Sequence, residues 1–137
     1  STPFPSTTLF RSKLSAKIAA VNSRPEVKVA IEVHFNAGST KASGCETLHN
    51  PGSVSGERLA RKVQSAMASF CAPNRGVKEG WYRQDPALGK LAWTDKIRAV
   101  SIIVEPLFIH ERDRIEAMAD IVPGVIADAL AEFYREM

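Results

Sequence analysis

Hydrophobic and polar residues alternate strictly over residues 27–34, and the four apolar positions on one side are all β-branched. This period of two, bounded by Pro25 and Gly38, predicts a β-strand within residues 27–38. His34 stands where the pattern gives way to Asn-Ala-Gly-Ser, at the carboxyl end of that strand. Open α/β sheets bind their ligands in the crevice outside such ends. His34 is therefore a candidate metal ligand or general base.

Apolar residues spaced three and four apart predict four helices. The first spans residues 12–21 with Ser12 as its cap, and the second follows a cap at Ser53 or Ser55. The third spans residues 112–119, and Asp120 is expected to cap the last. The two longest predicted helices bury the following apolar stripes: Leu59, Val63, Ala66, Met67 and Phe70; and Val122, Ile126, Ala129, Leu130 and Phe133.

Two further segments predict strands. Residues 45–49 form a short candidate, and the apolar run of residues 100–104 fits a strand buried on both faces. The stretch 77–96 contains Gly80, Pro86 and Gly89, which indicate only short strand and loop pieces. The alternation of helices and strands predicts one α/β domain over residues 1–137, with a mostly parallel or mixed sheet flanked by helices.

Composition places the chain among ordinary globular proteins, with 45% hydrophobic and 24% charged residues and a net charge of +3. No apolar run approaches the roughly 20 residues of a membrane span, and no signal peptide is visible. Cys45 and Cys71 read as buried small hydrophobes, although one disulfide stays open. Ten basic against five acidic residues over 41–98 leave nucleic-acid binding as a minor alternative to a solvated surface.

Glu105 directly follows the apolar run and is the second candidate for chemistry. Burying a carboxylate is costly unless it is paired or bound to a metal. Two strands of one sheet would bring His34 and Glu105 to the same crevice. A carboxylate beside a metal-bound water is a standard general base in hydrolysis. The alternative is that both residues are structural, with Glu105 satisfied by backbone donors or an arginine.

Four short motifs follow one another along the chain: Val33-His34-Phe35-Asn36-Ala37, Ser43-Gly44-Cys45-Glu46-Thr47, Arg75-Gly76-Val77-Lys78 and Val104-Glu105-Pro106-Leu107-Phe108-Ile109. A helix with Ser55, Leu59 and Ala60 lies between the second and the third. In this order they resemble the motifs of the zinc-dependent N-acetylmuramoyl-L-alanine amidases, the type-3 cell-wall amidases of bacteria and phage lysins. The resemblance covers the chain from about Ser12 to its C-terminus.

The resemblance implies that His34 is a ligand of Zn²⁺ and that Glu105 is the catalytic carboxylate that activates the zinc-bound water. Asn36 would help to orient the substrate. The reaction would be hydrolysis of the amide between N-acetylmuramic acid and L-alanine, with peptidoglycan as partner. The expected location is the cell envelope, the extracellular space or a phage lysin.

Several positions depart from the family pattern. The family has a Gly-His-Gly-type motif and a further Glu ligand upstream, whereas this sequence supplies one identifiable ligand of the three usual for catalytic zinc. We therefore expect the domain to be N-terminally incomplete. Leu107 replaces a glycine, and His49 and His110 are read as surface or loop residues. The alternative function is a degenerate, non-catalytic domain that binds wall fragments or a protein partner.

The remaining motif residues are read as structural or solvated. Glu46 is expected to be structural, and Arg75 and Lys78 to belong to a turn and a solvated face. Trp81, Tyr82 and Trp93 are candidates for a sugar or peptide groove, with core packing expected for at least one of them.

Overall fold

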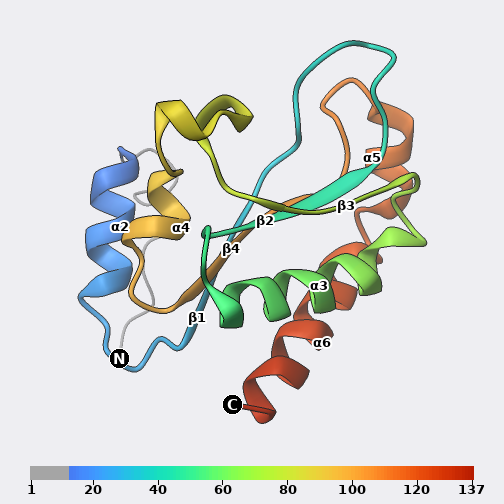
Figure 1. Ribbon diagram of the computed structural model, residues 1–137. Coiled ribbons are helices and arrows are strands. Elements are labelled where there is room, and N and C mark those ends of the chain that lie inside the picture. Colours follow the sequence, from blue (N-terminus) through green and yellow to red (C-terminus); the bar gives the residue numbers. More distant parts are fainter. Residues whose placement is uncertain (1–12) are drawn as a thin grey trace.

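Four strands form the centre of the molecule: β1 (Val29–Val33), β2 (Cys45–His49), β3 (Asn74–Glu79) and β4 (Val100–Glu105). They belong to a computed structural model that describes residues 13–137 (Figure 1). The strand order is β1-β4-β2-β3, in which β1 is parallel to β4, β2 is parallel to β3, and β2 is antiparallel to β4. The predicted α/β class with a mixed sheet is confirmed.

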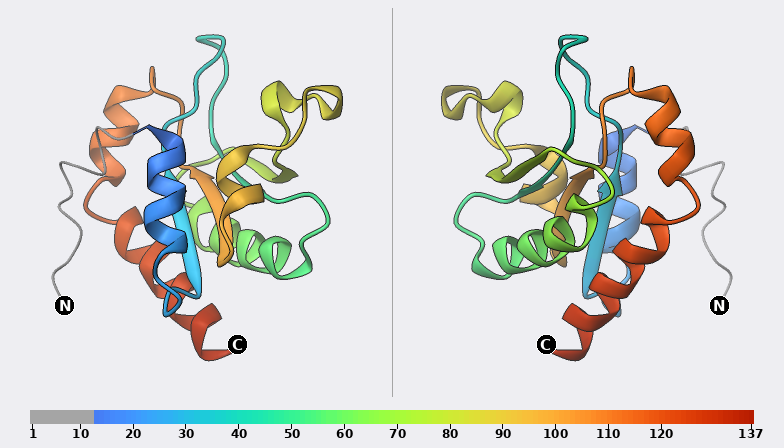
Figure 2. Two further views of the ribbon diagram at one scale, coloured as in Figure 1. Left: turned by 90° about the vertical axis from the view of Figure 1, so that its left-hand side faces the viewer. Right: turned by 90° about the vertical axis from the view of Figure 1, so that its right-hand side faces the viewer.

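Helices cover both faces of the sheet (Figures 1 and 2). One face carries α3 (Val54–Ala68), α5 (Arg112–Met118) and α6 (Val122–Arg135), and the other carries α2 (Leu14–Asn22) and α4 (Ala92–Lys96). Two 3₁₀ turns, η1 (Tyr82–Gln84) and η2 (Pro86–Leu88), lie between β3 and α4 in the chain. The result is a three-layer arrangement with the sheet in the middle.

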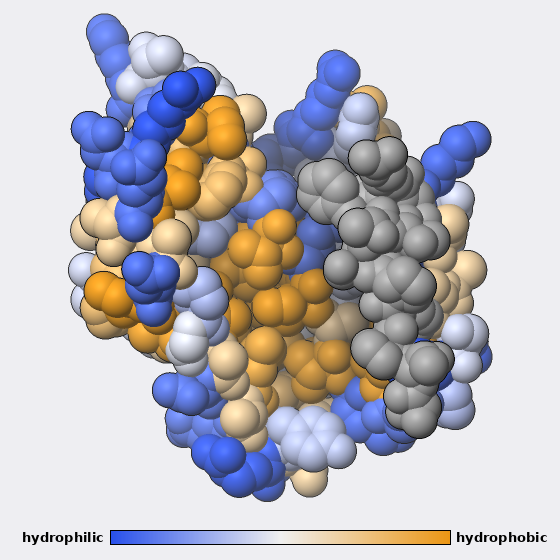
Figure 3. Space-filling view, turned by 180° about the vertical axis from the view of Figure 1, so that it is seen from behind, coloured by the Kyte–Doolittle hydropathy of each residue, from blue (hydrophilic) through white to orange (hydrophobic). Residues whose placement is uncertain are grey.

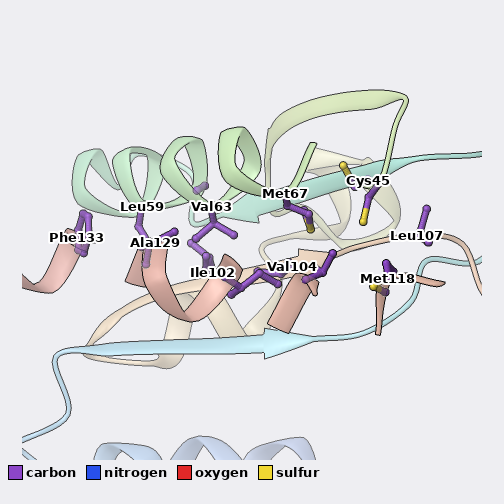
Figure 4. Packing of buried hydrophobic residues seen from close by; sticks show 14 residues of the cluster. Cys45, Leu59, Val63, Met67, Ile102, Val104, Leu107, Met118, Ala129 and Phe133 are labelled. Carbon is purple, nitrogen blue, oxygen red and sulfur yellow. The ribbon is translucent and has the colours of Figure 1, made fainter. Parts of the chain in front are cut away.

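The position of β4 between two helical layers explains why its sequence is almost continuously apolar. Ile102 and Val104 point toward α3 and α6, while Ile103 belongs to the smaller cluster under α2 and α4. Figure 4 shows the larger cluster, in which Leu59 and Val63 of α3 face this strand. A strand between two helical layers needs apolar side chains on both faces, and Glu105 at its end breaks that rule.

Strand β1 lies at an edge of the sheet. One of its faces carries apolar side chains, and the other carries polar ones. Its apolar side chains, together with those of α5 and α6, line a hollow of about 360 Å³. Figure 3 shows apolar side chains gathered in this hollow across the middle of that face. The opposite side of the strand carries Glu32 and ends at His34, so the alternation seen in the sequence directs His34 toward the α2 and α4 layer.

Several element boundaries differ from the prediction. Ile121, not Asp120, occupies the N-cap position of α6. Lys13 occupies that position in α2, and the predicted cap Ser12 and the lead-in of residues 1–8 lie outside the described residues. Strand β3 begins at Asn74, where a turn was predicted. The prediction that His49 is a surface or loop residue is wrong, because it lies within β2 and is 6% exposed.

The predictions for the cysteines and for a membrane span can also be compared with the structure. Cys45 and Cys71 are both buried and free, in agreement with the reading as small hydrophobes. Burial raises the pKa of the Cys71 thiol to about 11. Among the helices of residues 13–137, none combines the length and apolar character needed to cross a bilayer.

Ser53 is expected to stabilise α3 by capping it. Its hydroxyl accepts a hydrogen bond from the backbone N–H of Gly56 at 3.0 Å. Ser53→Ala should lower the free energy of unfolding by about 1 kcal/mol, because a helix-terminal N–H then lacks its partner. Urea denaturation measures the change. Ser55→Ala, on the exposed first turn of the same helix, is the matched control and should leave the midpoint unchanged or raise it. Equal losses in both variants would contradict the assignment of the cap.

Candidate active site

His34 and Glu105 meet at the end of the sheet, as predicted from two strand ends. The backbone N–H of His34 donates to the carbonyl of Val104 at 3.1 Å, which continues the parallel pairing of β1 with β4. Nδ1 of His34 lies 3.6 Å from Oε2 of Glu105. The imidazole is 43% exposed, whereas Glu105 is 7% exposed. A solvent-accessible ring therefore stands beside a buried carboxyl group.

Glu105 has a second carboxyl group as its neighbour across the sheet. Glu46 on β2 is the cross-strand partner of Glu105. Burial, and after it Glu46, raises the pKa of Glu105 to about 8, against the opposing charges of Lys78 and Arg75. Two neighbouring carboxylates repel each other when both are ionised, which costs free energy. This structure therefore favours a proton on Glu105 at neutral pH.

Glu46 connects all four motifs, since it lies in the second and opposite Glu105 of the fourth. Its carboxylate forms an ion pair with Lys78 of β3 and accepts a hydrogen bond of 2.6 Å from the side-chain amide of Asn36. The other end of that amide accepts from the backbone N–H of Ala37 at 2.8 Å. Asn36 is therefore engaged at both ends of its side chain, and its part in orienting substrate stays a prediction. Lys78 is not the freely solvated residue that the sequence indicated.

The loops around these residues are held by Glu111. This carboxylate accepts hydrogen bonds from the hydroxyl of Ser43 and from the backbone N–H groups of Gly44 and Phe108. Gly44 has φ of 101°, and a Cβ atom on it would lie 2.0 Å from the carbonyl oxygen of Pro73. Ser43 and Gly44 thus fix the position of the chain where it enters β2, the strand that carries Glu46.

A groove of about 320 Å³ opens from His34 and Glu105 along the face that carries α2 and α4. Trp81, Arg83 and Gln84 contribute to its wall, as does Trp93 of α4. Trp93 is also buried in the core, where its ring N–H donates to the carbonyl of Ile102 at 3.2 Å. The expectation of core packing for at least one aromatic residue is met, and Trp81 is placed to line a binding groove.

The residues that the structure describes supply only part of a metal-binding site. Nε2 of His34 lies 3.7 Å from Glu32 and its Nδ1 has only a long contact of 3.3 Å with the carbonyl of Phe35, so the ring is free to bind a cation. Within residues 13–137, no group of three or more His, Cys, Asp or Glu side chains is arranged to hold a metal. His34 therefore fits as one ligand, and the described chain does not complete the three that catalytic zinc usually has.

The other two histidines lie apart from this centre. Nδ1 of His49 lies 2.9 Å from the carbonyl of Asn50. Nε2 of His110 lies 2.8 Å from the carbonyl of Ala42 and so joins two loops, as expected for a loop residue. Sequence reasoning missed the participation of Glu46 and Lys78. The signal available was that each belongs to one of the four motifs.

Comparison with known proteins gives a consistent picture. A family model described as N-acetylmuramoyl-L-alanine amidase matches residues 7–131. Comparison with curated proteins found no match. Among solved structures, the catalytic domain of the CD27L endolysin, which targets Clostridia difficile, superposes with a TM-score of 0.70 at 21% identity over 86% of this chain and 61% of that one.

Two further solved structures have the same fold. The catalytic domain of CwlV, an N-acetylmuramoyl-L-alanine amidase from Bacillus (Paenibacillus) polymyxa, gives a TM-score of 0.73 at 16% identity, over 90% of this chain and 66% of that one. The CwlD amidase from Clostridioides difficile, solved with the GerS lipoprotein, gives 0.71 at 15% identity, over 90% and 62%. The chain thus spans less than two thirds of each of these proteins.

Proposed function

The chain belongs to the N-acetylmuramoyl-L-alanine amidase family, and we propose that it hydrolyses the amide bond between N-acetylmuramic acid and L-alanine in peptidoglycan. The observation that carries this proposal is the placement of Glu105 against His34, 3.6 Å apart at the common end of β4 and β1. An exposed imidazole beside a buried carboxyl group, at the head of a groove, suits activation of a water molecule against a bound carbonyl.

In its ionised form Glu105 acts as general base and then as general acid; a cation held at His34 would lower the pKa of this carboxyl group and favour that form. It takes a proton from the water whose oxygen attacks the carbonyl carbon of the lactyl group. It then delivers that proton to the nitrogen of L-alanine as the carbon–nitrogen bond breaks, so the products are a carboxylic acid and a free amine. Glu46 and Lys78 hold Glu105 from the side away from His34. They are positioning residues in this scheme.

His34 is proposed as one ligand of a catalytic zinc ion. When bound, zinc lowers the pKa of a coordinated water and polarises the carbonyl that is attacked. The proposed site of action is the peptidoglycan of the cell envelope, reached by an exported enzyme, an autolysin or a phage lysin.

A second candidate function rests on the incomplete ligand set. In this alternative the chain is a non-catalytic amidase-like domain that binds wall fragments or a protein partner. The described residues offer one metal ligand rather than three, which favours it. Zinc content separates the two functions, because a binding domain does not require stoichiometric metal.

The proposed activity is tested by incubating the intact protein with purified peptidoglycan and identifying the products by mass spectrometry. Amide hydrolysis should release stem peptides with a free N-terminal L-alanine and leave glycan strands with unsubstituted lactyl groups. Elemental analysis should find one zinc ion per chain. Retention on the wall without release of peptides, in protein without zinc, would instead support the binding domain.

A further inference from the structure

The groove beside the candidate active site has two chemically different ends. One end carries the acidic side chains Glu32 and Glu105 together with His34. The far wall is formed by the segment that follows β3, which includes Trp81, Arg83 and Gln84. Its volume of about 320 Å³ lies at the lower limit of ligand pockets, which is about 300 Å³. A short, extended ligand with an anionic group away from the acidic end would suit this arrangement.

Arg83 is the cationic side chain in the wall of this groove and could bind an anionic ligand. Its guanidinium carbon lies 5.4 Å from the centre of the Tyr82 ring, and the ion pairs found within residues 13–137 include no partner for it. Three other cations of the neighbouring segments have partners: Lys78 pairs with Glu46, Lys90 lies 3.9 Å from Asp95, and Arg75 stacks on the ring of Phe108 at 5.0 Å. A planar guanidinium held against an aromatic ring keeps its N–H groups free for a carboxylate.

The backbone at Arg83 is held in a conformation that its side chain disfavours. Arg83 has φ of 52° and Gln84 has φ of 58°, so two consecutive residues other than glycine are left-handed. Such residues store strain and are concentrated where ligands bind. Glycine would adopt the same conformation at a lower cost. An arginine at this position therefore requires a reason beyond the turn itself.

We propose that Arg83 binds a carboxylate of the stem peptide, on the alanine side of the bond that is cut. This inference rests on the proposed function, which places a muramoyl–peptide bond at Glu105. Arg83 offers parallel N–H donors to a carboxylate. The residue after L-alanine is either glutamate with a free α-carboxylate or its carboxamide, isoglutamine. Arg83 then makes the protein prefer walls in which this carboxylate is free.

The preference is measured by NMR titration of the intact protein with L-Ala-D-Gln, which has a free α-carboxylate and a blocked γ-carboxyl group, and, separately, with its α-amide, in which both carboxyl groups are blocked. The wild type should bind the acid about 5-fold more tightly, because Arg83 is exposed and an exposed ion pair contributes up to about this factor. Arg83→Gln should reduce the preference to within about 2-fold. Arg61→Gln, on α3 across the sheet, is the matched control and should keep the full preference.

A second variant separates recognition from structure. Arg83→Gly should raise the melting temperature, because it relieves the strained backbone, and should abolish the preference. An undiminished preference in Arg83→Gln, or equal binding of both peptides by the wild type, would overturn this inference. Hydrolysis of peptidoglycan tests the proposed function separately. Acid preference without hydrolysis contradicts only the function, and hydrolysis without acid preference contradicts only the inference.

Discussion

Replacing Glu105 by glutamine is expected to lower the rate of muramoyl–alanine hydrolysis by about 10²- to 10⁴-fold, which is the usual contribution of a general base. Glutamine keeps the shape of the side chain and can donate a hydrogen bond to Glu46, but it cannot accept a proton from water. The rate of release of L-alanine-terminated peptides from purified peptidoglycan measures the loss. The Michaelis constant should change little, because in the proposed mechanism Glu105 exchanges a proton and does not hold the substrate.

Two measurements show whether the loss is chemical. The zinc content of Glu105→Gln should equal that of the wild type, since His34 and not Glu105 is the proposed ligand. Glu116→Gln, on the exposed face of α5, should retain full activity and controls for removal of one negative charge. If Glu105→Gln hydrolysed peptidoglycan at the wild-type rate, the assignment of the base would be wrong.

The placement of Glu105 beside His34 was predictable because it depends on strand periodicity. The alternation before His34 and the apolar run before Glu105 each predict where a strand ends, and parallel strands bring their carboxyl ends to one edge. The segment 45–49 was predicted with the bounds that β2 has. Strong local patterns therefore sufficed for the central strands and for most of the apolar faces of α3 and α6. The prediction that Phe70 is buried is wrong, because it lies beyond the end of α3 and is 44% exposed.

Strand β3 escaped prediction because its first residues carry turn chemistry. Pro73, Asn74 and Gly76 are typical of a loop, and Gly76 has φ of 83°. A register shift in the pairing of β2 with β3 falls in the same region. Pairing with a buried neighbour overrides such local preferences, and a single sequence does not display that neighbour.

The pairing of Glu46 with Glu105 was hidden for a different reason. The two residues become neighbours only because β2 is antiparallel to β4, so that the start of one strand meets the end of the other. Residue spacing carries no information on strand direction. The strained backbone of Arg83 was hidden as well, because the left-handed conformation is ordinarily indicated by glycine or asparagine.

The same carboxyl group should make the stability of the metal-free protein depend on pH. Glu105 has a pKa of about 8 in the folded chain, raised first by burial and then by Glu46, against its ordinary value of 4.5. Between these two pH values the folded state binds the additional proton. The stabilisation is therefore complete below about pH 4.5 and is lost as the pH rises through about 8. Since one pKa unit corresponds to about 1.4 kcal/mol, the loss over the full shift is on the order of 5 kcal/mol.

Glu105→Gln should remove this dependence, because the amide is neutral at every pH and takes the place of the protonated acid. In the presence of a chelator, urea denaturation at pH 5.5, 7 and 8.5 should give midpoints that fall for the wild type and stay nearly level for the variant. Glu116→Gln should fall in parallel with the wild type. Parallel curves for Glu105→Gln would show that Glu105 is ionised in the folded chain at neutral pH. At pH 8.5, Glu105→Gln is expected to be more stable than the wild type and to have lost most of its activity. Such a trade-off is common where a functional residue lowers the stability of the fold.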